Sequence, residues 1–407
     1  MNKKSGGLLV AALFIAALNL RPAINSIAPL LETLREELQI SASFAGLLTA
    51  IPVLCMGLFS PVAAGMARRW GIERVIGTAL VLIGAGTALR FYAHSPLVLI
   101  VTAFGAGLGI ASVSPLLSGF IKRYFPGRIS WMIAIYTTAL TIGAALASSL
   151  SAPLQAAAGG SWRIALGSWS LLAVLAVPIW WLFVLRRMPA RAPAAGAEGL
   201  PDGRMPWGSG KAWLLTISFG LMAMLFYAVT AWLPPIIEGM GYTKAYAGYA
   251  LTGFVLIQIP AAIMLPALLQ RKPSRMLWLL AASGVELSGF LLLLLGFQPW
   301  LAALLIGVGA GTVFPLNLML PIDAADTPEA AASWAAMTQS AGYVIGSLGP
   351  LLLGWVHDWS GSFVPAVWCM IGIMVLMILV QLLVGRTLAR SSASEGGLAA
   401  AQAGESR

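Results

Sequence analysis

The sequence predicts an all-α membrane protein with twelve transmembrane helices, from its composition, the length of its apolar segments and the placement of its basic residues. Of its 407 residues, 59% are hydrophobic and only 9% are Asp, Glu, Lys or Arg. A soluble domain carries about a quarter charged residues and has no interior large enough for so much apolar surface. A bilayer accommodates it, because each spanning helix needs about 20 mostly apolar residues.

Twelve apolar segments of sufficient length follow one another along the chain. We expect helices at 8–31, 43–67, 74–92, 96–120, 130–154, 162–185, 211–237, 244–269, 274–295, 299–321, 331–356 and 363–386. The segment 186–210, rich in Ala, Pro, Gly and Arg, predicts a cytoplasmic linker. We therefore expect a six-helix bundle over 1–185, a second over 211–390, and a disordered cytoplasmic tail over 391–407.

The basic residues lie almost entirely in alternate loops. With the N-terminus inside, 19 of the 24 Lys and Arg residues fall in cytoplasmic segments, and four (Arg35, Arg90, Arg163 and Lys244) fall in outer loops. This positive-inside bias predicts a multi-pass protein of a bacterial cytoplasmic membrane with both termini in the cytoplasm. It also explains the net charge of +10 without a nucleic-acid partner.

The residues that most often build metal sites and disulfides are scarce. Cys55 and Cys369 lie far apart inside apolar runs, and His94 and His357 lie near predicted helix ends. These four residues predict neither a disulfide nor a metal cluster. We expect no metal, no cofactor and no enzymatic activity.

The two halves of the chain resemble each other. Ser130-Trp131 and Ile142-Gly143 recur as Ser333-Trp334 and Ile345-Gly346, each at an offset of 203 positions. Glycines and prolines in 96–120 recur at a similar offset. The pattern indicates a six-plus-six duplication, and parallel six-helix repeats with a substrate site between them are one architecture of secondary transporters.

Arg21 lies about two-thirds along the first predicted helix, within the hydrocarbon layer. An unpaired arginine there costs about 3 kcal/mol on insertion scales. Its side chain either bonds to helix carbonyls and holds the N-terminal half together, or supplies positive charge to a solute cavity. Because the only acidic residue inside an apolar run is Glu286, in the other half, we favour a solute anion or electron-rich group as its partner.

Other residues within the apolar runs are further candidates for the same cavity. We expect binding residues at Arg21, Asn25, Tyr136, Tyr227, Trp232, Asn317, Gln339 and Tyr343. The alternative for each is a helix–helix hydrogen bond. Glu286 is either a proton-carrying site or a structural, hydrogen-bonded glutamate; the family resemblance given below implies a peripheral place for its helix, which favours the structural role.

Loop charges suggest a gate on the cytoplasmic side. The candidates are Arg68, Arg69, Lys122, Arg123, Asp323 and Asp326, with the acids of one half pairing with the bases of the other when that side is closed. Exposed pairs contribute only about 0–1 kcal/mol each, so several would act together. The alternative is solvated loop charge.

Several motifs resemble one family. Ala17-Leu18-Asn19-Leu20-Arg21-Pro22-Ala23, Leu47-Leu48-Thr49-Ala50-Ile51-Pro52 and Arg68-Arg69-Trp70-Gly71-Ile72-Glu73-Arg74 are similar to the cyanate permease and 2-nitroimidazole transporter branch of the major facilitator superfamily. The resemblance spans essentially the whole chain. It implies a central cavity lined by helices 1, 4, 7 and 10, and rocker-switch alternating access. Arg68 stands where the superfamily's loop after helix 2 usually has aspartate, which puts gating by that aspartate in doubt.

The sequence therefore predicts a secondary active transporter of a small anionic or electron-rich solute, cyanate-like or nitroimidazole-like. The alternative is a proton-coupled multidrug or metabolite efflux pump, which requires an acidic cavity residue. A third class, a membrane receptor or enzyme without transport, would show no solute flux. We expect the partners to be the solute, the lipid bilayer and, as a candidate coupling ion, the proton, and we expect a monomer.

Overall fold

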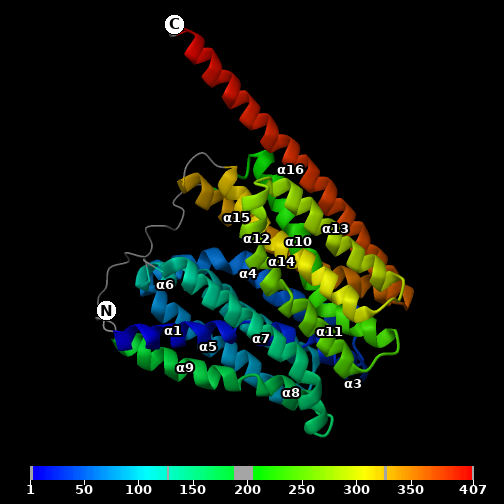
Figure 1. Cartoon of the computed structure of the whole chain (residues 1–407). Helices are drawn as coiled ribbons and strands as arrows, with labels where there is room; N and C mark the ends of the chain where they lie inside the picture. The colour runs from blue at the N-terminus through cyan, green and yellow to red at the C-terminus, as the bar shows by residue number, and fades with distance from the viewer. Residues whose placement is uncertain (1–2, 126–127, 188–204, 325–327, 406–407) are drawn as a thin grey trace.

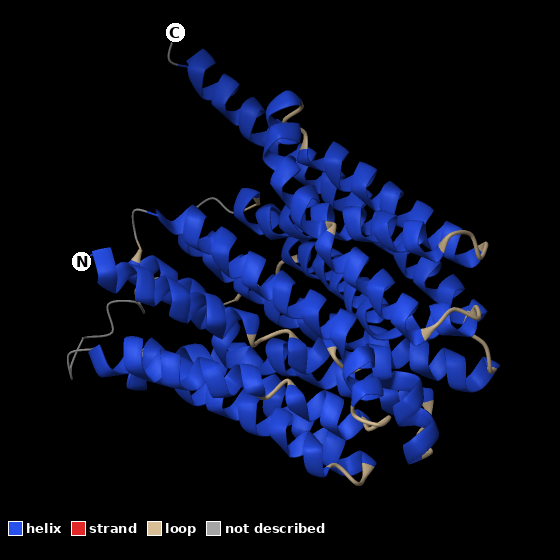
Figure 2. Ribbon diagram, turned by 60° about the horizontal axis from the view of Figure 1, so that its bottom comes forward, coloured by secondary structure: helices blue, strands red, loops and turns tan. Residues whose placement is uncertain are grey.

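The computed structural model describes residues 3–125, 128–187, 205–324 and 328–405. Within these ranges all regular secondary structure is helical, and the long helices run side by side (Figure 2). Figure 1 shows the N-terminal half, blue to green, packed beside the C-terminal half, with both ends of the chain at one end of the bundle. This arrangement agrees with an even number of membrane crossings.

The N-terminal half contains the first six membrane-crossing units. Its elements are α1 (Lys3–Leu18), α2 (Pro22–Asn25), η1 (Ala28–Leu30), α3 (Leu31–Leu38), α4 (Ala42–Trp70), α5 (Ile72–Ala88), η2 (Leu89–Tyr92), α6 (Pro96–Tyr124), α7 (Ile129–Ala157), α8 (Trp162–Ser168), α9 (Leu171–Phe183) and η4 (Leu185–Arg187). The C-terminal half contains α10 (Gly210–Gly239), α11 (Lys244–Leu256), α12 (Gln258–Arg271), α13 (Arg275–Leu294), α14 (Pro299–Asp323), α15 (Pro328–Ser360) and α16 (Val364–Glu405).

Eleven segments of the described chain are long and apolar enough to cross a membrane. The twelfth crossing is α15, with 33 residues. Its apolar part includes Thr338, Gln339, Ser340 and Ser347, which lower its mean hydropathy. A polar membrane helix is expected to face protein or a water-filled path rather than lipid.

Side-chain caps explain where six of the helices begin. A Ser or Thr hydroxyl accepts a hydrogen bond from a backbone N–H in the first turn of each. These caps are Ser41, Ser95, Ser161, Ser209, Thr243 and Ser274.

Prolines explain two interruptions that the sequence analysis did not predict. The expected helix 8–31 breaks after Leu18, and the expected helix 244–269 breaks after Leu256. Each break lies four residues before a proline, Pro22 or Pro260, because proline has no N–H to donate to the carbonyl one turn earlier. The expected helix 162–185 is also divided, at Trp169–Ser170, and no proline accounts for that break.

The C-terminal segment differs from the expected disordered tail over 391–407. In the structure α16 continues as a helix to Glu405 and projects beyond the bundle (Figure 1). The five alanines of 391–407 favour a helix, whereas its three glycines and four serines do not, so propensity alone does not account for this extension. Most of the expected linker, residues 188–204, lies outside the described chain.

The two halves contact each other along α4 with α15, and along α7 with α11. Glycines permit these close approaches. A Cβ at Gly354 would lie 2.5 Å from the Ala42 carbonyl oxygen, and one at Gly248 would lie 2.8 Å from the Ser148 carbonyl oxygen. The halves are therefore held together by backbone-close packing of small residues.

Candidate functional site

The break in the first membrane-crossing unit places Arg21 in a short non-helical turn. α1 ends at Leu18 and α2 begins at Pro22. In a continuous helix residue 22 would donate a hydrogen bond to the Leu18 carbonyl, but Pro22 has no N–H. This carbonyl packs closely against Gly143 of α7. Discontinuous membrane helices at a repeat interface are a common way to build a transporter site.

Arg21 is surrounded by aromatic side chains, most of them from the C-terminal half. Its guanidinium is hydrogen-bonded to the Tyr227 hydroxyl and lies close to Tyr343 and Tyr136. Its Cζ atom lies 5.7 Å from the ring centroid of Phe226, a cation–π distance. Although it is deep in the molecule, Arg21 is only half-buried, so part of its side chain faces internal space.

The tyrosines form a connected group around that arginine. The rings of Tyr227 and Tyr343 are edge to face, with centroids 6.4 Å apart. The Tyr227 hydroxyl also lies 3.8 Å from the Sδ atom of Met56 on α4, and Tyr136 is hydrogen-bonded to Ser114 on α6. Side chains from α4, α6, α7, α10 and α15 therefore meet at this point.

No carboxylate of the described residues forms an ion pair with Arg21. The described ion pairs are Arg35–Glu32, Arg123–Glu73 and Arg163–Glu37. Tyrosine hydroxyls and ring faces stabilise a guanidinium without neutralising it. The site therefore keeps a net positive charge that can attract an anion or an electron-rich group.

Two other predicted binding residues lie on the same helices as this group. Asn25 is in α2, one turn after Arg21; it is 1% exposed, and its Oδ1 atom has no hydrogen-bond partner in the described structure. Gln339 is half-buried on α15, one turn before Tyr343. Both stay predictions as binding residues.

Asn317 and Trp232 form hydrogen bonds within the C-terminal half. Asn317 accepts a hydrogen bond from Ser218 at 2.8 Å and donates one to the Val313 carbonyl at 3.1 Å. Trp232 is fully buried, and its Nε1–H donates to the Pro350 carbonyl oxygen at 2.8 Å. In this conformation both side chains join helices of one half, and their contact with solute stays a prediction.

Glu286 lies inside the C-terminal half on α13. Its side chain is 3% exposed, and its Oε2 atom has no hydrogen-bond partner in the part of the chain described. It packs closely against Gly309 of α14. One turn earlier, the Ser283 hydroxyl donates to the Gln381 amide oxygen of α16 at 2.9 Å, so Glu286 belongs to a buried polar layer of this half.

The predicted cytoplasmic gate is described only in part. Asp326 and the side chains of Arg68 and Asp323 lie outside the described residues. Arg69 and Lys122 are exposed, whereas Arg123 pairs with Glu73 of its own half at 3.1 Å. The gate stays a prediction.

Sequence reasoning missed several residues near Arg21. Phe226, Ser114 and Met56 are ordinary residues of apolar helices, and nothing in their spacing distinguishes them. Arg90 was counted with the outer loops although it lies in the expected helix 74–92, and it is 1% exposed. The sequence did carry a signal that Arg90 is not in a loop. No Gly, Pro or Asn stands beside it to indicate the end of the helix.

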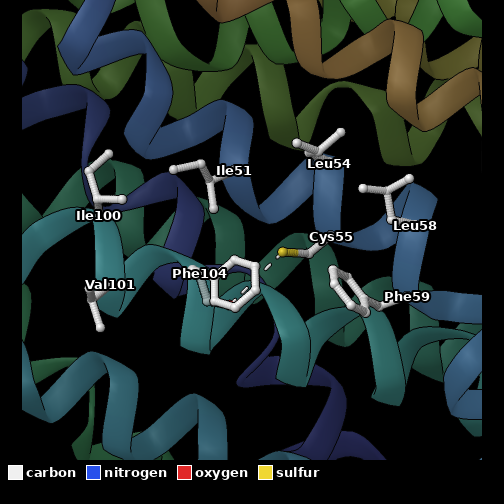
Figure 3. A pocket seen from close by; sticks show the side chains of 8 residues that line it. All are labelled: Ile51, Leu54, Cys55, Leu58, Phe59, Ile100, Val101 and Phe104. Atoms are coloured by element: carbon white, nitrogen blue, oxygen red, sulfur yellow. Dashed lines mark hydrogen bonds between the residues drawn. The ribbon is translucent and has the colours of Figure 1, made fainter.

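A separate apolar pocket lies between α4 and α6 (Figure 3). Its volume is about 240 Å³, and its lining residues are Ile51, Leu54, Cys55, Leu58, Phe59, Ile100, Val101 and Phe104. Several of these side chains, including Leu58 and Val101, are exposed on the apolar outer surface. None of the residues that surround Arg21 lines this pocket, so it is distinct from the arginine site.

Two packed six-helix halves, with an arginine at a helix break between them, are the architecture of a class of membrane transporters. The sequence profile of the Major Facilitator Superfamily matches residues 9–350. The chain belongs to that superfamily and is one of its membrane transporters.

Its relatives cover nearly its full length. The uncharacterized transporter YycB of Bacillus subtilis is 33% identical, over 91% of each chain. The 2-nitroimidazole transporter of Escherichia coli is 32% identical, over 94% of this chain and 95% of that one. The cyanate transport protein CynX of Escherichia coli is 29% identical, over 91% of this chain and 96% of that one.

Solved structures share the fold. A bacterial homolog of the human lysosomal transporter Spinster superposes with a TM-score of 0.78 at 15% identity, covering 96% of this chain and 99% of that one. The nucleoside transporter NupG superposes with a TM-score of 0.75 at 12% identity, covering 92% and 99%. At these identities the likeness concerns the fold alone.

Proposed function

We propose that this protein is a secondary active transporter of a small anionic or electron-rich solute, held at Arg21 and moved by alternating access. The observation that carries the proposal is the unneutralised guanidinium of Arg21, half-buried at the interface of the halves. A buried charge without a partner is costly, and a solute with the opposite charge or a strong acceptor offsets that cost.

The chemistry around Arg21 favours a small, flat solute. A guanidinium offers several N–H donors in one plane, and the faces and edges of Phe226, Tyr227 and Tyr343 limit the space beside it. Cyanate, a linear anion, and the planar nitro group of 2-nitroimidazole are small acceptors that fit beside such a guanidinium. The relatives bearing those names support this substrate class.

Alternating access is supported by contacts at one end of the interface, the end predicted to face outward. Asp358, just beyond the predicted span 331–356 on α15, accepts hydrogen bonds from the backbone N–H groups of Ala42 at 2.6 Å and Ser43 at 2.7 Å, and from the Ser43 hydroxyl. Lys244 of α11 donates to Thr33 of α3 at 2.6 Å. These bonds between halves must break for the outer side to open.

Uptake into proteoliposomes tests the proposal. The wild type should transport labelled cyanate or 2-nitroimidazole, and unlabelled solute should compete. Arg21→Lys should retain part of the activity, since it keeps the charge but loses the planar donors, and Arg21→Ala should lose it. Arg74→Ala, which removes an exposed arginine, is the matched control. Equal uptake by Arg21→Ala and the wild type would refute the site.

A proton-coupled efflux pump is the second candidate, favoured by the unpartnered buried oxygen of Glu286. In that case Glu286→Gln should abolish transport driven by a pH gradient while leaving binding intact. If Glu286 is structural, Glu286→Gln should leave the gradient dependence unchanged. We further propose that the protein acts as a monomer in the cytoplasmic membrane with both termini inside.

A further inference from the structure

A second arginine, Arg90, lies entirely inside the N-terminal half. It belongs to η2, at the end of the third membrane-crossing unit, and its side chain is 1% exposed. Its Nη2 atom donates a hydrogen bond of 2.9 Å to the Ala23 carbonyl oxygen of α2. Arg90 forms no ion pair with a carboxylate of the described residues, so a role in charge pairing does not explain it.

The helix break explains why the Ala23 carbonyl needs such a donor. In a continuous helix the Ile27 N–H would donate to it. Here α2 ends at Asn25, and the Ile27 N–H donates to the Ile24 carbonyl instead, at 3.3 Å. A buried carbonyl without a donor is costly in a membrane, and the guanidinium of Arg90 supplies the missing hydrogen bond.

We propose that Arg90 is a positioning residue for solute binding: it fixes the broken segment, and thereby the orientation of Arg21 two residues before Ala23. The four residues of α2 have too few internal hydrogen bonds to hold their own position. The contact from η2 ties them to the rigid helix α5. A charge-assisted hydrogen bond is also stronger than a neutral one, which suits a fixed support.

This inference rests on the proposed function, but one of its tests does not require a solute. Backbone hydrogen exchange should be measured for residues 18–27 in the wild type, Arg90→Leu and Arg90→Lys. Exchange in this segment should become faster in Arg90→Leu, with a smaller change in Arg90→Lys, which keeps a charged donor. Unchanged exchange in Arg90→Leu would overturn the proposal.

The second test measures solute affinity by thermal stabilisation with cyanate and with 2-nitroimidazole. Arg90→Leu should weaken binding about tenfold, equivalent to about 1.4 kcal/mol, and Arg90→Lys should restore part of it. The matched control is Gln381→Leu, which removes the buried hydrogen bond to Ser283 in the other half. The control should lower the melting temperature without changing the affinity.

A double-mutant cycle separates positioning from general stability. In an Arg21→Lys background, Arg90→Leu should have much less effect on affinity, because the side chain that it positions is gone. Fully additive losses, or a lower melting temperature with unchanged affinity, would contradict the proposal. If Arg21→Ala binds solute like the wild type, the proposed function fails, and the hydrogen-exchange result still decides whether Arg90 holds the segment.

Discussion

The two halves repeat one architecture, but their first helices differ. At the offset of 203 positions, Arg21 and Pro22 correspond to Met224 and Leu225. The N-terminal helix breaks there, whereas α10 runs without interruption from Gly210 to Gly239. The N-terminal half thus supplies the charge and an irregular backbone, and the C-terminal half supplies a rigid aromatic wall with Phe226 and Tyr227. Duplication has produced a scaffold that is symmetric and a site that is not.

The largest expected effect concerns two glycines that correspond across the repeat, Gly143 and Gly346. A Cβ at Gly143 would clash with the Leu18 carbonyl oxygen at the break, whereas one at Gly346 would lie 2.7 Å from the Ala223 side chain. Gly143→Ala should destabilise by about 1–3 kcal/mol, more than Gly346→Ala does, because backbone relaxes less than side chains. Melting temperatures in detergent compare the two variants; a larger loss for Gly346→Ala would contradict the asymmetry.

The next effect tests whether the break itself matters. Pro22→Ala restores an N–H that can bond to the Leu18 carbonyl. We expect a more regular helix, a displaced Arg21 and solute binding about tenfold weaker, equivalent to about 1.4 kcal/mol. Pro260→Ala, at the other proline-linked break, is the control and should leave affinity unchanged. Thermal titrations with solute measure the affinity of both variants. Equal losses of affinity would show that the effect is not specific to the break beside Arg21.

A smaller effect tests the aromatic wall. Tyr227→Phe removes the hydroxyl that is hydrogen-bonded to Arg21 and keeps the ring. A hydrogen bond contributes about 0.5–1.5 kcal/mol, so affinity should change by about two- to tenfold. Tyr246→Phe, on α11 away from Arg21, serves as the control. If Tyr227→Phe titrates like the wild type, the hydroxyl has no part in orienting Arg21.

The smallest effect tests the contact between the halves at Asp358. Burial disfavours the ionised carboxyl, but hydrogen bonds from Ser43 and Ala42 outweigh it and lower the pKa of Asp358 below its usual value. A negative charge at a helix N-terminus contributes about 0.3–1 kcal/mol. In a protein that carries Gln339→Cys, adding Asp358→Asn should therefore make this cysteine react about two- to fivefold faster with an impermeant thiol reagent from outside.

The same contact has a defined pH dependence. Because the pKa of Asp358 is lowered when the halves are joined, its stabilising contribution is present above its usual pKa and is lost as the pH falls through the lowered value. The measurement is the ratio of labelling rates between Asp358→Asn and its parent at the same pH, both carrying Gln339→Cys, because the ratio cancels the pH dependence of the thiol itself. This ratio should be constant between pH 8 and pH 5 and fall towards one only in stronger acid. A change in the ratio near pH 6 would implicate a different group.

The sequence was sufficient for the helix count and the six-plus-six architecture, because these follow from hydropathy and spacing. The cost of a buried charge also singled out Arg21, whose role in binding stays a prediction. It could not locate the break, since membrane helices often tolerate proline and only neighbouring contacts decide whether Pro22 kinks or interrupts the helix. Phe226 and Arg90 were not predicted as neighbours of the site, because packing between distant helices brings them there. Asn317 and Asn25 looked alike as polar residues in apolar runs, yet the amide oxygen of Asn317 accepts a hydrogen bond whereas that of Asn25 has no partner among the described residues.

The central claim is that Arg21 holds the solute. The most direct measurement is a thermal-shift titration with cyanate and with 2-nitroimidazole on the wild type, Arg21→Ala and the exposed-site control Arg74→Ala. The account predicts that at least one of these solutes stabilises the wild type and Arg74→Ala to the same extent and fails to stabilise Arg21→Ala. Equal stabilisation of Arg21→Ala would contradict it.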